Sequence, residues 1–586
     1  MSDITTFKKY LRPYRGKIAL GIFTIAVSMI FGLAVPYMVG AAVDDLAAGI
    51  TWNKIIYYPL AILALNLTSG IFLFLQRRLL INVSRYIEFD MRDDFFNRLI
   101  IQPAEFFQSN RVGDLMARAT NDLAAIRQIV GPMILYSFQA IFALAITLPI
   151  LFGISVKLTL LMLLPLPLVS LTVKILGEQI HKRFEKIQEF FADISARAQE
   201  NISGVRVIRA FAREKTELDK FDQLNQEYAR QNLRLVKFAA AMRPMLFFFI
   251  GLGFVVIVAV GVPAAIRGEM TAGDFTSFIL YLQRMIWYLI ALGYVVNLYQ
   301  RGTASLKRFN SVLSILPTIS DSEKTRPQKP IEGEIEFRNL VFSYKNGPKV
   351  LDGINLKIEK GKTVAFVGKT GSGKSTLVSL IPRLFDAPYG MVLIDGKPVQ
   401  DYPLEQLRKA IGFVPQESYL FSDTLAANIA FGLNGQKDKA SENGYLSIEA
   451  AAEAAGLSED IRQFPDGFNQ IVGERGITLS GGQKQRTSLA RALARNPKIL
   501  ILDDALSAVD TYTEEKILSR LREIRKGRTA IIVSHRISTI KDADLICVLK
   551  GGKIIESGTH RELVDLGGEY SELYERQQLE EELEAA

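Results

Sequence analysis

The segment GKTGSGKS, from Gly368 to Ser375, decides the fold of the second half of this 586-residue chain. It follows an apolar run, Thr363–Val367, and opens a helical pattern, Thr376–Ile381. The spacing G-x-x-x-x-G-K-[ST] between a strand and a helix is that of a phosphate-binding loop. Glycines let backbone amides approach the phosphates, the lysine and the helix N-terminus add positive charge, and the serine hydroxyl can reach Mg²⁺. We expect the nucleotide to be held by Gly368, Lys369, Thr370, Gly371, Ser372, Gly373, Lys374, Ser375 and Thr376.

A second apolar run, Ile499–Asp503, ends in a carboxylate. A buried strand that delivers an aspartate to the metal ion is the expected Walker B partner of a phosphate loop. Alone, such a run is a weak signal, but its place in order behind the loop makes it a strong one. We therefore expect Asp503 and Ser375 to hold Mg²⁺ together.

The sequence around these motifs has the pattern of an α/β domain. Glu334–Tyr344 alternates like a strand, and short β-branched runs are then interleaved with helical segments. The polar stretch Asp321–Pro330, with two prolines, is typical of a linker. We expect a linker over 318–332, a phosphate-loop nucleotide-binding domain over 333–566, and an acidic C-terminal helix without an assignable role over 567–586.

The first half has six runs apolar enough to cross a membrane, since about 20 residues span the hydrocarbon core. They are Ile18–Val43, Ile55–Leu75, Met133–Ile154, Leu158–Leu176, Met245–Ile266 and Phe275–Leu298. Buried core helices of a soluble protein are the alternative, but six such runs would be a large excess. Phe7–Tyr14 is expected to be a short amphipathic segment on the membrane surface. The expected architecture is therefore an α-helical membrane domain over 1–317, followed by the α/β domain.

Charge predicts the orientation of these helices. Residues 1–310 carry 34 Lys and Arg against 22 Asp and Glu, in a chain whose net charge is +9. The connections 77–130 and 174–243 hold eight and fourteen of the basic residues, whereas the other three connections are short and nearly uncharged. By the positive-inside rule, both basic connections and the N-terminus are cytosolic. Their helical pattern predicts that the membrane helices continue far into the cytosol.

Composition excludes several other classes of protein. With 49% hydrophobic residues the chain is not disordered. With one cysteine, Cys547, the chain has no disulfide framework. The small number of histidines, which are His181, His535 and His560, argues against a histidine-rich metal site. The excess positive charge lies beside long apolar runs, so a lipid bilayer explains it better than nucleic acid, and we expect no nucleic-acid partner.

A short segment before the helical pattern Lys484–Leu493 points to a family. Small residues at a helix start expose amides suited to a γ-phosphate, and here they are Leu479, Ser480, Gly481, Gly482 and Gln483. This segment resembles the signature of the ATP-binding cassette (ABC) family. Six spans followed by one cassette resemble a half-size exporter of the multidrug and lipid-exporter type, over essentially the whole chain. The resemblance implies ATP and Mg²⁺ as cofactors.

Further positions match family motifs, and their roles are those that the resemblance implies. Tyr344 resembles the aromatic residue that stacks on adenine, with an ordinary strand aromatic as the alternative. Gln416 resembles the glutamine that senses Mg²⁺ and signals to the membrane helices. His535 resembles the switch histidine that contacts the γ-phosphate, and Ser507–Asp510 resembles the D-loop, with Asp510 facing the nucleotide.

Three segments resemble the parts of exporters that connect cassettes to membrane helices. Gly473–Gly476, just before the signature, resembles the segment that contacts the opposite transmembrane half. Gly113–Ala125, which contains Asn121 and Asp122, and Gly204–Glu217 resemble the intracellular loops that carry coupling helices onto the cassettes. Solvated charged helix faces are the alternative for these two loops.

One position departs from the family pattern. After the Walker B aspartate the family has a glutamate that polarises the attacking water, whereas this chain has Asp504. Its side chain is one methylene shorter, and a general base must come within about 2.6–3.2 Å of the group it serves. Because a misplacement of about 1 Å can cost about 100-fold in rate, we expect ATP to bind at this Walker site and to be hydrolysed slowly.

The departure bears on the partner of the chain. Family cassettes work as a head-to-tail pair, with each ATP between the Walker motifs of one and the signature of the other. A substituted base with an intact signature resembles the degenerate-site subunit of a heterodimeric exporter, in which Ser480 and Gly482 would complete the partner's site. The retained His535 leaves a weakly hydrolysing homodimer open. An ATP-gated regulator or channel subunit is a further alternative, whereas the six spans argue against a soluble cassette ATPase.

The expected function is ATP hydrolysis coupled to export of amphipathic or hydrophobic substrates, drugs or lipids, across the plasma membrane. Candidates for lining the substrate cavity are Arg284, Gln283, Trp287, Tyr281 and the run Phe247–Phe249. A charge inside a membrane is costly, so Arg284 is expected to face a cavity or a partner. Packing against lipid or protein is an equal alternative for each of these residues.

Overall fold

The computed structural model describes residues 3–164, 166–321, 325–345, 347–433, 446–509, 511–525 and 527–585. The chain forms two compact units. The first comprises Met1–Arg98 and Gly113–Ile315, and the second comprises Leu99–Val112 and Leu316–Ala586. The second unit thus contains a short insertion from the helical half of the sequence.

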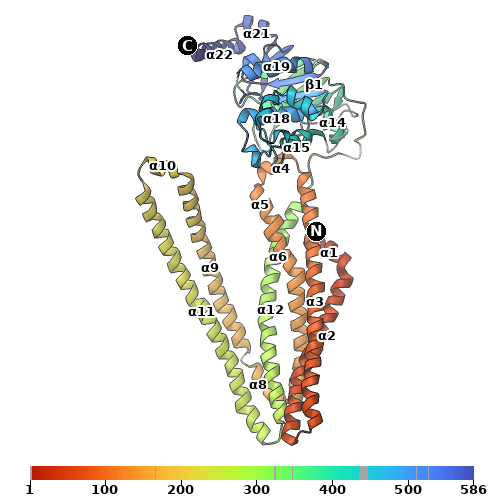
Figure 1. Cartoon of the computed structure of the whole chain (residues 1–586), viewed down its shortest axis with the longest axis vertical. Helices are drawn as coiled ribbons and strands as arrows, with labels where there is room; N and C mark the ends of the chain where they lie inside the picture. The colour runs from red at the N-terminus through yellow and green to blue at the C-terminus, as the bar shows by residue number, and fades with distance from the viewer. Residues whose placement is uncertain are drawn as a thin grey trace. The chain divides into compact units, whose positions relative to one another are not determined.

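The first unit is built from helices, most of them long (Figure 1). They are α1 (Asp3–Leu11), α2 (Arg15–Ala48), α3 (Trp52–Ile100), α5 (Val112–Ala117), α6 (Leu123–Gln128), α7 (Ile134–Ile154), α8 (Val156–Leu163), α9 (Leu166–Ser203), α10 (Val205–Ala210), α11 (Glu214–Ile266) and α12 (Ala272–Leu313). Two π-helical turns, Arg118–Asp122 and Ile129–Met133, continue the path from α5 through α6 to α7.

Among the described residues, five helical stretches are long and apolar enough to cross a membrane. They are Phe7–Ala48, Trp52–Ile100, Val112–Ile154, Glu214–Ile266 and Ala272–Leu313. Each contains one predicted span. The remaining predicted span, Leu158–Leu176, is divided between α8 and α9 around Pro165, which lies outside the described residues.

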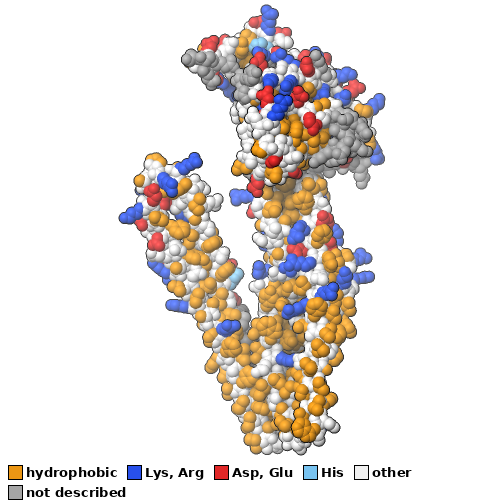
Figure 2. Space-filling model, viewed as in Figure 1, with side chains coloured by type: hydrophobic (Ala, Val, Ile, Leu, Met, Phe, Trp, Pro, Cys, Tyr) orange, Lys and Arg blue, Asp and Glu red, His pale blue; other side chains and the backbone are white. Residues whose placement is uncertain are grey.

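The helices continue well beyond their apolar runs, as predicted. α9 and α11 lie side by side and are joined at α10, so the second basic connection forms a long helical hairpin (Figure 1). Figure 2 shows hydrophobic side chains covering one stretch of these helices, with most Lys and Arg side chains outside it. Such a separation of apolar from charged side chains is expected for helices that pass from the hydrocarbon of a bilayer into water, since charged side chains are costly in hydrocarbon.

Small residues bring α2 and α12 close together. A Cβ atom on Gly40 would lie 2.6 Å from the carbonyl oxygen of Gly273. Asp44 accepts hydrogen bonds from the Gly273 amide at 2.6 Å and from the Thr271 hydroxyl at 2.7 Å. Close backbone approach through small residues is the usual basis of helix packing in membranes, and a larger residue at either glycine would separate the two helices.

Two of the side chains predicted to line a substrate cavity make hydrogen bonds between α2 and α12. Tyr281 is fully buried and donates a hydrogen bond to the Leu33 carbonyl at 2.8 Å. Arg284 is half-buried and donates to the carbonyl of Gly32. The Tyr281 hydroxyl and one N–H group of Arg284 are thereby bonded within the bundle, as the packing alternative predicts, and a cavity role for Arg284 stays a prediction. Trp287 and Phe247 have mostly exposed side chains.

The second unit contains short helices and ten strands among its described residues. The helices are α4 (Ala104–Ser109), α13 (Lys374–Leu380), α14 (Leu404–Ala410), α15 (Leu425–Ala430), α16 (Ile448–Ala454), α17 (Ser458–Gln463), α18 (Gly481–Ala494), α19 (Thr511–Arg525), α20 (Ile537–Ile540), α21 (His560–Leu566) and α22 (Glu569–Ala585). The strands are β1 (Ile335–Ser343), β2 (Lys349–Ile358), β3 (Thr363–Val367), β4 (Val392–Ile394), β5 (Lys397–Pro398), β6 (Ile411–Val414), β7 (Ile499–Asp503), β8 (Thr529–Val533), β9 (Leu545–Lys550) and β10 (Lys553–Gly558). The α/β fold class is confirmed.

The strands form two sheets. One is antiparallel with the order β2-β1-β4-β5, and the other has the order β10-β9-β3-β8-β7-β6. In the larger sheet only the edge strand β10 is antiparallel. The strands β3, β7 and β8 are buried at every position. Parallel strands covered on both faces need continuous apolar sequence, which is why these three read as unbroken apolar runs.

The two faces of the larger sheet have separate cores. Val364 and Phe366 point into a core shared with the smaller sheet, whereas Ala365 and Val367 point into a core shared with α15, α16 and α18. Successive side chains of a strand point to opposite faces. The phosphate loop, which follows β3, therefore starts from a strand that is fixed on both sides.

The predicted coupling region Gly113–Ala125 does not lie in the second unit. It belongs to the first, where Asp122 is buried and accepts hydrogen bonds from the Ser305 hydroxyl at 2.9 Å and from Arg308 Nε at 3.0 Å. The segment that packs into the second unit is the earlier one, Leu99–Val112, with helix α4. Asp122 thus joins the π-helical turn to α12, and a role of Gly113–Ala125 in coupling stays a prediction.

Replacement of Asp122 tests this contact. Asp122→Ala should lower the free energy of unfolding by about 1–2 kcal/mol, because it leaves the Ser305 and Arg308 donors without their acceptor. Thermal and urea unfolding of the detergent-solubilised protein measure the change. Asp114→Ala, which removes an exposed carboxylate from α5, is the matched control. Equal losses for the two variants would contradict the assignment.

Candidate nucleotide-binding site

Residues far apart in the sequence line one cavity of about 190 Å³ in the second unit. The lining residues are Val350, Thr370, Gly371, Gly373, Lys374, Ser375, Thr376, Gln416, Asp503, Asp504, Val533 and His535. The cavity lies at the carboxyl ends of β3, β6, β7 and β8, where ligands bind in open parallel sheets. A larger cavity, of about 590 Å³ between the linker and α14, contains none of the predicted site residues.

Two glycines of the phosphate loop have backbone conformations that other residues rarely adopt. Gly368 has φ +146° and Gly373 has φ +102°. A Cβ atom on Gly368 would collide with the carbonyl oxygen of Leu549, and one on Gly373 would lie 3.0 Å from the carbonyl oxygen of Val350. The loop therefore needs glycine at these positions both for its backbone angles and for its packing on β2 and β9.

Lys374 closes the loop on itself. Its Nζ donates hydrogen bonds to the carbonyls of Gly368 at 2.7 Å and Lys369 at 3.0 Å. Burial lowers the pKa of Lys374, while the nearby charge of Asp503 opposes that shift. The buried ammonium is thus held at the centre of the loop, where phosphate oxygens can replace or join the two carbonyls as acceptors.

Ser375 and Asp503 meet across the cavity. The Ser375 hydroxyl donates to Asp503 Oδ1 at 2.9 Å. Burial at the end of β7 raises the pKa of Asp503, and the hydrogen bond from Ser375 works against that rise. No group of three or more His, Cys, Asp or Glu that could hold a metal was found in the described part of the chain. Mg²⁺ does not need one, because it keeps several waters and binds phosphates with one or two protein ligands.

Gln416 supplies a third oxygen to the same cavity. It follows β6, has an exposed side chain and lines the cavity beside Asp503. A hydroxyl, a carboxylate and an amide oxygen are the hard donors that Mg²⁺ prefers. The residues present therefore fit this ion, with Ser375, Asp503 and Gln416 as the groups that would hold it.

Asp504 lines the cavity from a backbone that is fixed on both sides. Its φ is +51°, a left-handed conformation that aspartate tolerates better than most residues. Its amide donates to the Val533 carbonyl at 2.8 Å, and its carbonyl accepts from the Ser507 hydroxyl at 3.0 Å and from Gln485 Nε2 at 3.4 Å. With the backbone held in this way, the reach of its carboxylate depends on the length and the rotamer of the side chain.

Gln485 helps to hold the segment that follows Asp504, a role that the sequence analysis did not predict. Its buried amide donates to the Ser507 hydroxyl at 2.9 Å, and its Oε1 accepts from the Ala508 amide at 2.9 Å. It thus ties helix α18 to the segment that follows Asp504. The available signal was an amide at the helical spacing of the buried positions Gly482 and Leu489. Asp510, predicted for the same segment, lies outside the described residues.

Tyr344 lies close to the phosphate-loop helix but does not line the cavity. Its hydroxyl is hydrogen-bonded to the Thr376 hydroxyl at 2.9 Å. Its ring packs edge-to-face on Phe342 and Phe385, with centroid distances of 5.2 and 5.1 Å. Three aromatic rings thus lie together beside α13, and a role in adenine binding stays a prediction.

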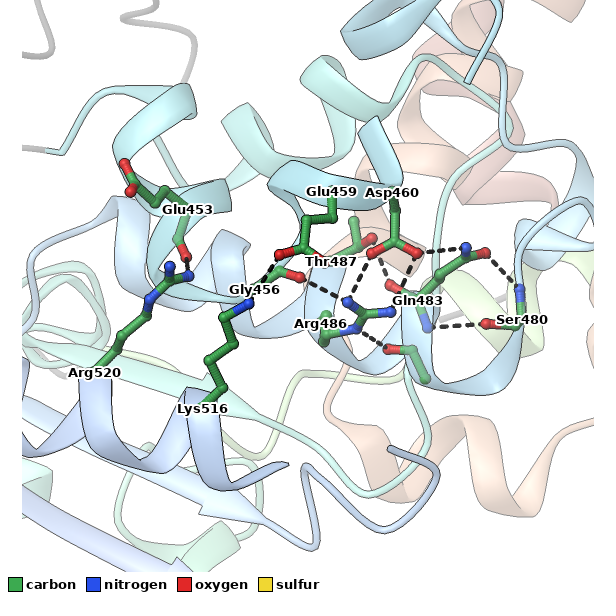
Figure 3. A network of polar contacts seen from close by, with 11 residues as sticks. Glu453, Gly456, Glu459, Asp460, Ser480, Gln483, Arg486, Thr487, Lys516 and Arg520 are labelled. Carbon is green, nitrogen blue, oxygen red and sulfur yellow. Dashed lines mark hydrogen bonds and ion pairs between the residues drawn. The ribbon is translucent and has the colours of Figure 1, made fainter. Parts of the chain in front are cut away.

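The signature segment forms a capped helix start (Figure 3). Ser480 is the N-cap of α18: its Oγ accepts from the Gln483 amide at 3.3 Å, and Gln483 Oε1 accepts from the Ser480 amide at 2.9 Å. This is a reciprocal capping box. Because the Ser480 hydroxyl is an acceptor here, its own proton can serve a further acceptor. Leu479 is buried just before the cap, whereas Gly481 is exposed at the first turn.

Two contacts hold this helix start in place. A Cβ atom on Gly482 would lie 2.9 Å from the Ala508 carbonyl oxygen, so α18 approaches that segment closely. On the other side, Asp460 of α17 accepts from Gln483 Nε2 at 2.8 Å and from Arg486 Nη1 at 2.7 Å (Figure 3). The exposed amides of the signature are thus presented by a helix that is fixed against its neighbours.

Comparisons with known proteins follow the same division of the chain. The family model described as the ABC transporter transmembrane region matches residues 18–289, and the model described as ABC transporter matches residues 351–507.

Curated relatives match almost from end to end. "Probable multidrug resistance ABC transporter ATP-binding/permease protein YheI" of Bacillus subtilis is 37% identical, over 95% of this chain and 95% of its own length. "Multidrug resistance-like ATP-binding protein MdlA" of Escherichia coli is 34% identical, over 99% and 97%. An "ATP-dependent lipid A-core flippase" of Syntrophus aciditrophicus is 34% identical, over 97% and 93%.

A solved structure also matches along nearly the whole chain. It is that of a bacterial Atm1-family ABC exporter with ATP bound, with a TM-score of 0.79 and 27% identity. The match covers 96% of this chain and 98% of that one. The fold of both units therefore agrees with a known exporter.

Ser375 offers a direct test of the magnesium assignment. Ser375→Ala should weaken binding of a fluorescent ATP analogue by about tenfold in the presence of Mg²⁺, as expected for loss of a ligand or its close support. Binding in excess chelator should change little, because Lys374 and the loop amides remain. Ser379→Ala removes a hydroxyl one turn further along α13, which donates to the Ser375 carbonyl, and is the control. Equal losses with and without Mg²⁺ would contradict the assignment.

Proposed function

The chain belongs to the ABC transporter family and is an ABC exporter, and on that premise we propose that it is one subunit of a heterodimeric exporter whose own ATP site hydrolyses slowly. The observation that carries this proposal is Asp504, at the position of the family's catalytic glutamate. Its carboxylate is short, and its backbone is held by β8, Ser507 and Gln485. The main chain is therefore not free to move forward and compensate.

The intact signature supports an unequal pair. Ser480, Gly481 and Gly482 keep the small residues and the capped helix start that a partner's ATP requires. In the proposed heterodimer this signature completes the partner's site, where a glutamate performs the hydrolysis. The site of this chain holds its ATP for longer and keeps the pair closed.

The hairpin of α9 and α11 supports pairing with a second chain. Around α10, the apolar side chains of Ile202, Val207 and Phe211 are 75%, 62% and 74% exposed. Exposed apolar groups that lie together mark interaction sites. We propose that this tip, which overlaps Gly204–Glu217, docks on the nucleotide-binding domain of the partner and carries movement between that domain and the membrane helices.

The geometry supports the following roles at the site of this chain. The loop amides and Lys374 bind the phosphates. Ser375, Asp503 and Gln416 would hold Mg²⁺, which neutralises phosphate charge when bound. Asp504 would act on the water that attacks the γ-phosphate, but its shorter side chain stops short of it. His535, which follows the neighbouring strand β8, would supply a hydrogen bond to the γ-phosphate. Tyr344 and Asp510 are proposed to contact the nucleotide at its base and at the dimer interface.

Transport follows from differential binding. ATP must favour the closed pair over the open one, since a ligand with equal affinity for both states shifts nothing. Closure turns the membrane helices toward the outside, and hydrolysis in the partner's site resets them. We propose amphipathic drugs or lipids as substrates, because the relatives are named as multidrug resistance proteins and as a lipid A-core flippase. We also propose the plasma membrane as location, with the N-terminus and both basic connections in the cytosol.

Asp504→Glu tests the proposed cause of slow hydrolysis. The added methylene extends the carboxylate from a fixed backbone, so hydrolysis at this chain's own site, measured in a complex whose partner glutamate is replaced by glutamine, should rise by about 10- to 100-fold. Asp504→Asn, which has the same shape and no base, should give no increase. Because glutamate tolerates the left-handed backbone less well, the melting temperature is measured alongside. An unchanged rate in a folded Asp504→Glu complex would place the defect elsewhere.

Native mass spectrometry of the complex extracted from its own membrane tests the partner. A second, different chain beside this one of 65.4 kDa is expected. A mass of 130.8 kDa, which is twice 65.4 kDa, with one kind of chain would overturn the heterodimer in favour of a homodimer with two Asp504 sites.

A further inference from the structure

The acidic C-terminal segment, which the function described so far does not use, forms helix α22 and is anchored at its start. Glu556 accepts hydrogen bonds from the amides of Glu569 at 2.7 Å and Tyr570 at 3.1 Å. A carboxylate at a helix N-terminus is favoured by the free amides and the helix dipole. Tyr570 is fully buried, and its hydroxyl is hydrogen-bonded to His560 Nδ1 at 2.8 Å. The helix is thus fixed to the body of the domain.

Two turns further along, Gln577 reaches the loop that carries His535. Its Oε1 accepts a hydrogen bond from the Ile537 amide at 2.9 Å, and its Nε2 donates to the His535 carbonyl. The side-chain amide therefore bonds the backbone on both sides of Arg536. Both bonds depend on the amide of Gln577 and not on the side chains of the loop.

The other side of this loop is held by Arg536. Its guanidinium pairs with the buried carboxylate of Glu514 and donates to the Val509 carbonyl at 3.2 Å. Glu514 also accepts from the Thr539 hydroxyl. With Gln577 on one side and Glu514 on the other, the backbone at His535 is held in place, and its exposed imidazole lines the nucleotide cavity.

The same helix touches the phosphate loop. Glu569 pairs with Lys550 at 2.7 Å and with Lys369, the second residue of the phosphate loop, at 3.4 Å. One helix outside the cavity thus contacts both the loop after β3 and the loop after β8. These are the two loops that face the phosphates in the proposed function.

We propose that Gln577 is a positioning residue for His535: by bonding the backbone on both sides of Arg536 it keeps the imidazole directed at the γ-phosphate. This inference rests on the role proposed for His535 above. A displacement of about 1 Å in a group that contacts the reacting atoms has large effects. The two backbone bonds of one amide oppose such a displacement, and α22 thereby becomes part of the nucleotide site.

Hydrogen exchange at the imidazole C2 position, followed by mass spectrometry, tests the proposal without requiring hydrolysis. The chain has three histidines, His181, His535 and His560, so each gives its own signal. The full-length protein with its partner is compared with and without Mg²⁺ and the non-hydrolysable analogue AMP-PNP. In the unmodified protein AMP-PNP should slow exchange at His535.

In Gln577→Leu the factor by which AMP-PNP slows exchange at His535 should be about tenfold smaller than in the unmodified protein. This is the effect expected for loss of two hydrogen bonds that hold one conformation. Its affinity for AMP-PNP should stay within about twofold of that of the unmodified protein, since the phosphate loop retains most of the binding contacts. Exchange at His560, which reports whether the start of α22 is still docked, should stay unchanged. Gln578→Leu is the matched control, because Gln578 is bonded on α22 itself, to the Tyr574 hydroxyl at 2.8 Å.

Gln577→Glu is the second variant, in case the leucine variant releases α22 and accelerates exchange at His560. It keeps the size and the acceptor for the Ile537 amide but loses the donor to the His535 carbonyl, so it too should reduce the slowing. Full slowing at His535 in a docked Gln577→Leu or in Gln577→Glu overturns this inference alone. No slowing in the unmodified protein, with AMP-PNP bound, overturns the role of His535 and the inference with it.

Discussion

The hydrogen bond from the Ser375 hydroxyl to the Asp503 carboxylate joins the first turn of α13 to the end of β7, and the nucleotide site depends on this contact. It can form because β3 and β7 flank β8 in one parallel sheet, so that their carboxyl ends lie at the same edge. The register Phe366–Val533 and Asp503–Val533 brings the ends of all three strands level. Burial of the strands on both faces keeps that edge rigid, and every other group of the site is placed relative to it.

Elements outside the cavity then decide where its side chains lie. Gln485 from α18 and the Val533 carbonyl hold the backbone of Asp504. Gln577 from α22 and Glu514 from α19 hold the loop of His535. With the main chain held in this way, the length of the side chain limits how far the carboxylate at position 504 extends. In the proposed function, a change of a single methylene at this position therefore slows hydrolysis.

The helices of the first unit are held together by different interactions, because helices in a membrane gain little free energy from burying apolar surface against one another. Its contacts depend on small residues, such as Gly40 against Gly273, and on polar groups satisfied between helices, such as Tyr281 with the Leu33 carbonyl. Polar residues in the spans are therefore ambiguous from sequence. Tyr281 and Arg284, which are candidate cavity residues, are hydrogen-bonded to α2, and Asp122 joins a π-helical turn to α12.

The sequence by itself determined the order of the parts, the strand–loop–helix of Gly368–Ser375, the strand that ends at Asp503, the strand before His535, and the substitution at position 504. Such features depend on the local spacing of residues and on continuous apolar runs, and both can be recognised directly in the amino-acid sequence. Only the tertiary structure decided that Leu99–Val112 belongs with the nucleotide-binding unit, that Gln485 supports Asp504 and that Gln577 supports His535. These contacts join residues between 19 and 42 positions apart, or separate units of the chain. A lone glutamine on a helix gives no local sign of which distant backbone group it will meet, because that meeting is fixed by how the elements pack.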